Sequence, residues 1–301
     1  MPSRTWVDEL LGDETSQRLR ALSGSKLNSA LMEVLRARAG VRTAAEVLHQ
    51  FESDRFSAPA QVKPRVQSRI DAELFEGASE FEDVELSPVA PLGACSAIGL
   101  TDQRRTLSAL RSTEVVSDPT NVLALECASR LRGEPSRAVH LATSHRVLRA
   151  QAVPALPGYS AHFRMFALAS GGLEAVEHGF TREAISLQLR ALLRGLDRLE
   201  RVGYRFGARR IEVRVDARLV SLRAALESDL RALGVPVTAT TLEHPYYSGG
   251  VKFLVWVTTP RGEEMPLIDG GSFDWLRTLT SNQRVVFVAS GMGSQLVSLR
   301  F

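Results

Sequence analysis

The segment Ala138–Gly172 reads AVHLATSHRVLRAQAVPALPGYSAHFRMFALASGG, and its pattern predicts an antiparallel hairpin. Two apolar-rich runs, Ala138–Ala150 and Ala161–Ser170, flank a connection that carries Pro154, Pro157 and Gly158. Proline and glycine interrupt strands and are typical of loops. We therefore expect two paired strands joined by a long, exposed loop.

Four basic side chains stand within these apolar runs: Arg146, Arg149, His162 and Arg164. Because successive side chains of a strand point to opposite faces, Arg146 is expected to share a face with Leu148, and His162 with Arg164. A sheet that presents guanidinium groups from its middle can bind an anion. The alternative is an exposed sheet face that carries charges, and the hairpin residues alone favour neither interpretation.

The composition is that of an ordinary globular protein. The chain has 301 residues, of which 44% are hydrophobic and 24% charged, and its net charge of +3 is too small to indicate nucleic-acid binding. Cys95 and Cys127 are too few for a cysteine-rich metal site, and such low cysteine usage is typical of a reducing cytoplasm. No apolar run has transmembrane length, and the N-terminus lacks a signal-peptide core, so we expect no membrane association.

The order of apolar patterns predicts an α+β fold around a mainly antiparallel sheet. Residues 1–51 are expected to form a helical N-terminal segment, with three short helices in a small bundle, followed by a linker at 52–61. The remainder, 62–301, is expected to begin with a helix at Pro64–Phe75 and a strand at Phe81–Gly93. After the hairpin, helical and strand patterns alternate to the C-terminus.

The same order resembles the catalytic core of class II aminoacyl-tRNA synthetases, closest to histidyl-tRNA synthetase and its paralogues. The helix and strand that end at Pro88 resemble the first family motif, the hairpin resembles the second, and Val285–Leu299 resembles the third. IDGGSFDWL, from Ile268 to Leu276, is similar to the Gly-Gly-Arg-Tyr-Asp turn of histidyl-tRNA synthetases. HPYYSGGVKF (244–253) is similar to their Asp-Tyr-Tyr-Thr segment, and Asp118-Pro119-Thr120 stands where they have Glu-Gly-Thr.

The resemblance implies a set of ligand-binding residues and a dimer. The ligand-binding residues are Asp118, Thr120, Arg146, Arg164, Tyr246, Tyr247, Gly270 and Gly271. In the family, the motif-two arginine holds the ATP α-phosphate, and the first motif builds a homodimer interface. We accordingly expect Val66, Ile70 and Leu74 to be exposed for a two-fold contact.

Each expected site residue also has a structural interpretation. Asp118 and Thr120 could simply cap a helix, and Arg146 could be an arginine paired within the sheet. Alternation indicates that only one of Tyr246 and Tyr247 faces the site. The Gly270-Gly271 pair is expected to serve a tight turn. His145, His162 and His244 have no acidic partners at useful spacing, so no metal site is expected.

Several charged groups of the family are missing. With His145-Arg146-Val147-Leu148 aligned to the Phe-Arg-x-Glu pattern of motif two, leucine replaces the glutamate that accepts from adenine. Motif three carries no arginine between Ser290 and Leu299, no arginine precedes the tyrosine pair, and Ser272 stands at another arginine position. Adenylation depends on fixed positive charge, and each strong contact contributes ~10²–10³ in rate.

The resemblance therefore implies a non-catalytic protein without a cofactor, such as the regulatory subunit of ATP phosphoribosyltransferase in histidine biosynthesis. That family acts with a catalytic phosphoribosyltransferase subunit and senses histidine. One alternative is an orphan paralogue that serves as a structural or protein-interaction module. Another is an enzyme that activates a different carboxylate or amine by altered chemistry.

Overall fold

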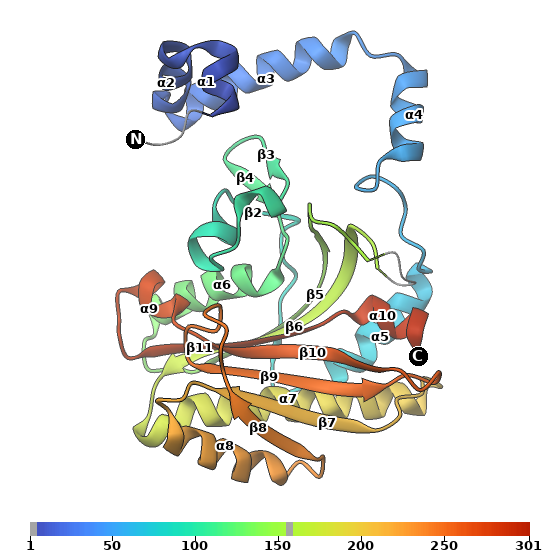
Figure 1. The fold of residues 1–301 in the computed structure, drawn as a ribbon, viewed down its shortest axis with the longest axis vertical. Helices are drawn as coiled ribbons and strands as arrows, with labels where there is room; N and C mark the ends of the chain where they lie inside the picture. The colour runs from blue at the N-terminus through green and yellow to red at the C-terminus, as the bar shows by residue number, and fades with distance from the viewer. Residues whose placement is uncertain (1–4, 155–158) are drawn as a thin grey trace.

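The protein is built on an eight-stranded sheet, shown in the computed structural model of residues 5–154 and 159–301 (Figure 1). The strand order is β1-β5-β6-β11-β10-β9-β7-β8, and only the outermost strands, β1 and β8, run parallel to their neighbours. The expected α+β fold with a mainly antiparallel sheet is confirmed. The strands of this sheet are β1 (Glu82–Asp83), β5 (Val139–Leu148), β6 (His162–Leu173), β7 (Arg209–Val215), β8 (Val237–Thr241), β9 (Val251–Thr258), β10 (Glu264–Phe273) and β11 (Val285–Met292).

The predicted hairpin forms the β5–β6 pair, which joins ten residues of each strand from Val139↔Gly171 to Leu148↔His162. β6 pairs antiparallel with β11, and β5 lies beside the short edge strand β1. Part of the expected hairpin loop, including Pro157 and Gly158, lies outside the described residues. The first strand of the expected motif one is short, because only Glu82–Asp83 pairs with β5.

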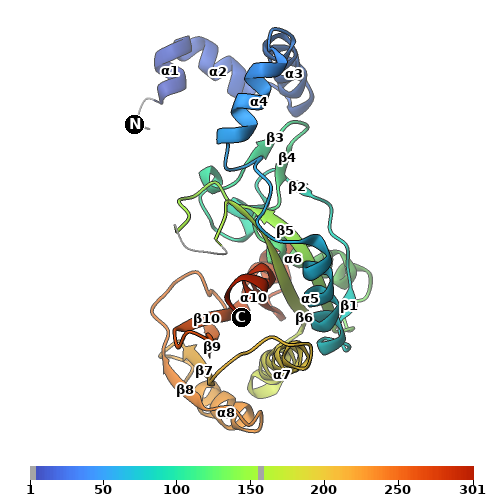
Figure 2. The ribbon, with the colours of Figure 1, turned by 90° about the vertical axis from the view of Figure 1, so that its right-hand side faces the viewer.

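Helices cover both faces of the sheet (Figures 1 and 2). One face packs against α5 (Pro64–Gly77), α7 (Gly179–Arg201), α8 (Val220–Arg231) and α10 (Ser294–Arg300) in the larger apolar core. The other face packs against α6 (Pro119–Gly133) and α9 (Trp275–Thr280) in a second core. A small sheet of β2 (Val89–Pro91), β4 (Thr113–Val115) and β3 (Ser108–Ala109) precedes α6.

The helix α5 belongs to the core of its own chain. Ile70 and Leu74 are fully buried against the sheet and α7, and Val66 packs on the same core. The expectation that these three side chains are exposed for a two-fold contact is therefore wrong. Their spacing predicts an apolar helix face that another surface covers, and that surface is α7 of the same chain and not a second copy.

The N-terminal segment is helical, as expected, but it does not form a bundle. Its helices are α1 (Trp6–Leu11), α2 (Asp13–Ala21), α3 (Gly24–Gly40) and α4 (Ala44–Ser53). α1 packs on α2, whereas neither α3 nor α4 has a buried residue. In Figure 1 these helices stand apart from the sheet, above the β2–β4 sheet. The bundle prediction failed because apolar spacing shows that a helix has an apolar face without showing what covers it.

Packing between α5 and α7 requires glycine at their contact. A Cβ atom built on Gly77 would lie 2.7 Å from the backbone of Gly195. Gly77→Ala should therefore lower the free energy of unfolding by about 1–3 kcal/mol, because the helices must move apart. Gly133 likewise ends its helix, α6, yet its Cβ would meet no atom within 4 Å.

Gly133→Ala is the matched control, and it should leave stability unchanged or raise it by up to about 1 kcal/mol. Urea unfolding of the three proteins measures the difference. Equal stability of Gly77→Ala and Gly133→Ala would contradict the close packing of α5 on α7.

Candidate functional site

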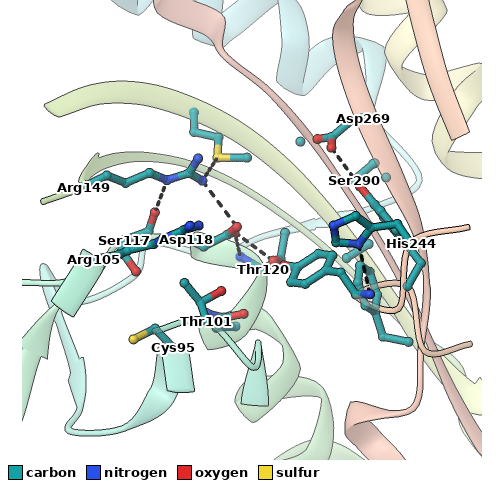
Figure 3. A pocket seen from close by; sticks show the side chains of 18 of the residues that line it. Cys95, Thr101, Arg105, Ser117, Asp118, Thr120, Arg149, His244, Asp269 and Ser290 are labelled. Atoms are coloured by element: carbon teal, nitrogen blue, oxygen red, sulfur yellow. Dashed lines mark hydrogen bonds and ion pairs between the residues drawn. The ribbon is translucent and has the colours of Figure 1, made fainter. Parts of the chain in front are cut away.

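A cavity of about 340 Å³ opens on the α6 face of the sheet. The start of α6, the far end of the β5–β6 hairpin, the loop between β8 and β9, and the middle of β10 and β11 enclose it (Figure 3). Its lining includes Cys95, Arg105, Ser117, Asp118, Thr120, Asn121, Arg149, Gln151, His244, Tyr246, Tyr247, Asp269, Gly270 and Ser290. The described residues hold no group of three or more His, Cys, Asp or Glu side chains that could bind a metal ion.

Asp118 and Arg149 form the polar wall of the cavity. Asp118 is the N-cap of α6, where its Oδ1 accepts from the Thr120 backbone N–H at 3.0 Å and from its hydroxyl at 2.8 Å. Its Oδ2 pairs with Arg149 Nη2 at 3.4 Å, and Arg149 Nε donates to the Ser117 carbonyl at 2.9 Å (Figure 3). Asp118 therefore caps the helix and also lines the cavity.

Asp269 lies on the floor of the cavity from strand β10. The Tyr247 hydroxyl donates to its Oδ2 at 2.9 Å, and no Lys or Arg of the described residues lies within ion-pair distance. The Asp269 side chain is exposed to the cavity, although protein atoms lie on most sides of it. The low-dielectric surroundings raise the pKa of Asp269, and the Asp118 carboxylate adds to the increase, while the Tyr247 hydrogen bond and the charges of Lys252 and Arg149 partly oppose it.

Both tyrosines of the His-Pro-Tyr-Tyr segment line the cavity. Alternation does not apply to them, because they lie in the loop after β8 and not within a strand. Their rings meet edge to face at 5.2 Å and pack on Phe273, which stacks on Trp275. The expectation that only one tyrosine faces the site is therefore wrong. Burial raises the pKa of both hydroxyls, so they remain neutral hydrogen-bonding groups.

Gly270 and Gly271 lie within β10 and do not form the expected turn. They pair with β11 on one side and β9 on the other. A Cβ on Gly271 would lie 2.4 Å from Tyr247 Cδ1, and one on Gly270 would lie 2.5 Å from Phe253 Cζ. The glycines therefore give these rings room to approach the strand. Gly270 lines the cavity, whereas Gly271 does not.

Arg146 and Arg164 lie on the opposite face of the sheet, outside the cavity. They stand opposite each other in the β5–β6 ladder. Arg164 Nε pairs with Asp71 Oδ2 of α5 at 3.1 Å. Arg146 Nη1 lies 3.0 Å from His162 Nδ1 and 3.4 Å from Gln295 Oε1. The geometry therefore does not place either arginine in the expected site.

Arg149 and Gln151 occupy the places that Arg146 and Leu148 were expected to fill. Leu148-Arg149-Ala150-Gln151 also fits an apolar-Arg-x-Glu pattern, with glutamine for glutamate, three residues further along the chain. That alignment was available from the sequence, and an odd shift moves the arginine to the other face of the sheet. The glutamine amide can accept a hydrogen bond, which the leucine cannot.

A second cavity of about 280 Å³ adjoins the first and shares Arg149 and Gln151 with it. Its other walls are mainly apolar and come from residues that follow β5, begin β6 and begin α10, including Val153, Pro154, Phe163 and Leu296. Among the described lining residues of both cavities, only Arg105 and Arg149 are arginines or lysines. Arg300 points elsewhere and pairs with Glu263.

The fold of the chain matches solved class II synthetase-like proteins. An ATP phosphoribosyltransferase regulatory subunit/histidyl-tRNA synthetase from Bacillus halodurans is 14% identical, with a TM-score of 0.60 over 80% of this chain and 81% of that chain. Histidyl-tRNA synthetase of S. aureus is 12% identical, with a TM-score of 0.57 over 79% of this chain and 67% of that chain. A histidine–tRNA ligase subunit from Alicyclobacillus acidocaldarius is 14% identical, with a TM-score of 0.56 over 79% and 94%.

These likenesses confirm the class II synthetase-like fold expected from the sequence. No protein-family model matches the chain, and no curated protein matches its sequence. No helix of the described residues is long and apolar enough to cross a membrane.

The raised pKa of Asp269 makes the stability of the folded protein depend on pH. The folded state binds this proton more tightly than the unfolded chain does, so the ionised carboxylate opposes folding above its folded pKa. The penalty disappears as the pH falls towards the ordinary value of 3.8. Asp269→Asn should therefore raise the melting temperature at pH 7 and lose this advantage near pH 4.

Asp118→Asn provides the comparison within the same cavity. It removes the ion pair with Arg149 and keeps a capping side chain, so it should not raise the melting temperature at pH 7. Scanning calorimetry at the two pH values measures both variants. A lower melting temperature of Asp269→Asn at pH 7 would show that the carboxylate is compensated by a partner in the folded state.

Proposed function

We propose that this protein binds an amino acid, histidine or a similar zwitterion, in the larger cavity and acts as a regulatory protein without aminoacylation activity. The observation that carries the proposal is the Asp269 carboxylate, which faces the cavity and forms no ion pair with a Lys or Arg side chain of the described residues, although Lys252 and Arg149 act on it from further away. A carboxylate that faces a cavity enclosed mainly by protein has fewer waters around it, so it favours a ligand cation or hydrogen-bond donors. A ligand ammonium group would supply that cation.

The two ends of a zwitterion fit groups on opposite sides of the cavity. Asp269, with Tyr247 beside it, would accept from the ammonium group. Arg149 would bind the carboxylate, because its Nη1 has no hydrogen-bond partner among the described residues while Nε and Nη2 are held in place. An arginine oriented by two fixed contacts loses little entropy when it binds an anion.

The lack of fixed positive charge supports a non-catalytic role. Adenylation of a carboxylate builds negative charge on the α-phosphate and the leaving pyrophosphate, which requires several preorganised cations. The described lining offers Arg149, which is already shared with Asp118, and Arg105 at the solvent-exposed edge. In this proposal, the apolar second cavity can hold an adenine ring beside Gln151. The protein could therefore bind a nucleotide without catalysing adenylation.

A regulatory subunit of ATP phosphoribosyltransferase is the role that we favour. In this proposal, residues 62–301 form the ligand-binding core, the protein works in the cytoplasm as a homodimer, and its partner is a catalytic phosphoribosyltransferase subunit. The support is the fold shared with the Bacillus halodurans protein described as such a regulatory subunit. Histidine in the cavity would then report the level of the pathway's end product to the partner.

A protein-interaction module without a ligand is the second candidate. It is favoured by the N-terminal helices, whose apolar side chains are exposed. The two candidates differ in whether the cavity binds anything. A thermal-shift screen with the twenty amino acids and with nucleotides distinguishes them, because a ligand of the folded state alone raises the melting temperature.

Arg149 and Arg146 form a matched pair for testing the site. Both are arginines of the same hairpin, but only Arg149 lines the cavity. With the amino acid that gives the largest thermal shift, Arg149→Met should weaken binding by about tenfold to a hundredfold, as expected when a charge-assisted contact of about 1.5–3 kcal/mol is lost.

Arg146→Met should leave that affinity unchanged, whatever it does to stability. Titration calorimetry on both variants and the wild type measures this. Equal weakening by the two substitutions would remove the cavity from the proposal, and the absence of any amino-acid ligand would favour the interaction module.

The non-catalytic assignment has its own test. Amino-acid-dependent exchange of labelled pyrophosphate into ATP should stay at background with each of the twenty amino acids, because the described cavities lack the cations that adenylation needs. Clear exchange with any amino acid would show instead that the protein activates a carboxylate by different contacts.

A further inference from the structure

The N-terminal helices present an apolar surface that nothing in the chain covers. Twelve of the eighteen exposed large apolar side chains of the described residues lie between Trp6 and Phe51, so the exposure is concentrated in this segment. They are Trp6, Val7, Leu10, Leu11, Leu31, Met32, Val34, Leu35, Val41, Val47, Leu48 and Phe51. We call residues 5–53 the N-terminal arm.

The apolar residues of α3 form one stripe. Leu27, Leu31, Val34 and Leu35 follow the i, i+4, i+7, i+8 spacing of a single helix face. A helix of 17 residues has little stability in water when it buries no surface. Contiguous exposed apolar patches of this kind mark interaction surfaces. The stripe therefore needs a covering partner.

The core contacts the arm near the start of α3 and just beyond its C-terminal end. Near the start of α3, Asn28 Oδ1 accepts from the Arg111 backbone N–H at 3.1 Å, and its Nδ2 donates to Ser112 Oγ at 3.3 Å. Beyond α4, Arg55 Nη1 donates to the Gln151 carbonyl at 2.9 Å. His162 Nε2 lies 2.7 Å from the Ala58 carbonyl. These contacts flank α3 and α4, so they hold the α3 stripe in one orientation relative to the core.

Opposite charges stand at the two ends of α3. Residues 8–14 contain four acidic residues and no basic one, and they belong to α1 and the start of α2. Asp8 pairs with Arg20 and Glu14 with Arg18 of α2, so this end keeps an acidic excess of two over the basic residues of α1 and α2. Residues 36–42 contain Arg36, Arg38 and Arg42 and no acidic one. None of these arginines forms an ion pair with a side chain of the described residues. The length of α3, about 25 Å at 1.5 Å per residue, separates the two charged ends.

We propose that the N-terminal arm is the dimer interface, with α3 of a second copy packed antiparallel against α3. A two-fold axis brings the same patch of both copies together, so the stripe of one arm covers the stripe of the other. The antiparallel direction places the acidic end of each arm against the three arginines of its partner. Parallel packing would bring like charges together at both ends. The proposal does not depend on the ligand of the cavity.

Sedimentation of the full-length protein between about 1 and 100 µM tests the interface. The wild type should be a dimer, and Leu31→Asp should weaken dimerisation at least tenfold, because it places a charge in the middle of the stripe. Val202→Asp is the control: Val202 is also exposed, but it lies at the end of α7, so this variant should dimerise as the wild type does. A wild type that is monomeric throughout this range would overturn the proposal.

Charge exchange tests the antiparallel direction. Arg36→Glu with Arg38→Glu makes both ends of the arm acidic, and Glu9→Arg with Glu14→Arg makes both ends basic. Each double variant should dimerise about tenfold or more weakly than the wild type. An equimolar mixture of the two variants should form a one-to-one heterodimer, because each acidic end of one variant's arm then meets a basic end of the other's.

Thermal melting of each variant shows that it is folded, and the exposed Trp6 should shift its emission to shorter wavelength when the heterodimer forms. A mixture that stays monomeric would overturn the antiparallel arrangement. Dimers that are insensitive to both charge reversals and to Leu31→Asp would show that the copies meet elsewhere or that the arm serves a different protein.

Discussion

The antiparallel register of β5 against β6 determines which face of the sheet each side chain of the hairpin serves. Ala142 and Phe166 lie on the face that packs against α5 and α7, whereas Leu141 and Ala167 lie on the face of α6. Arg146 falls with the first group and Arg149 with the second. A slip of one residue would exchange these faces and bury charges in both apolar cores. The two cores therefore fix the register, and the register places Arg149 in the cavity.

The cavity keeps the groups of a recognition site with little of the charge that phosphate chemistry needs. Three separate elements contribute: the α6 cap provides Asp118, β10 provides Asp269, and the loop before β9 provides Tyr247. Gly271 lets the Tyr247 ring approach β10, which brings its hydroxyl to Asp269. On the β11–α10 side, serine, glycine and glutamine stand where the resembling family carries an arginine. This combination is the basis of our proposal that the cavity binds an amino acid and does not activate it.

The sequence predicted the fold because its strongest signals are local ones: apolar periodicity, proline breaks and the order of elements. The family resemblance indicated Asp118, Thr120 and one of the two tyrosines for the site, and the structure places these residues and both tyrosines at the cavity. Arg149 was missed because two overlapping alignments fit the hairpin and only the sheet register separates them. The roles of Ile70, Leu74 and Gly271 depend on what packs against them, and that is a tertiary property that no local pattern contains.

The proposed function requires that the Asp269 carboxylate, which forms no ion pair in the free protein, accepts a cationic group of the ligand. Carbon-detected NMR titration of the Asp269 carboxyl group tests it most directly, first on the protein alone and then with millimolar histidine as the probe. We expect a pKa above the ordinary value of 3.8 in the free protein, and a lower pKa when an ammonium group binds beside it. A pKa at or below 3.8 in the free protein, unchanged by histidine, would contradict the account.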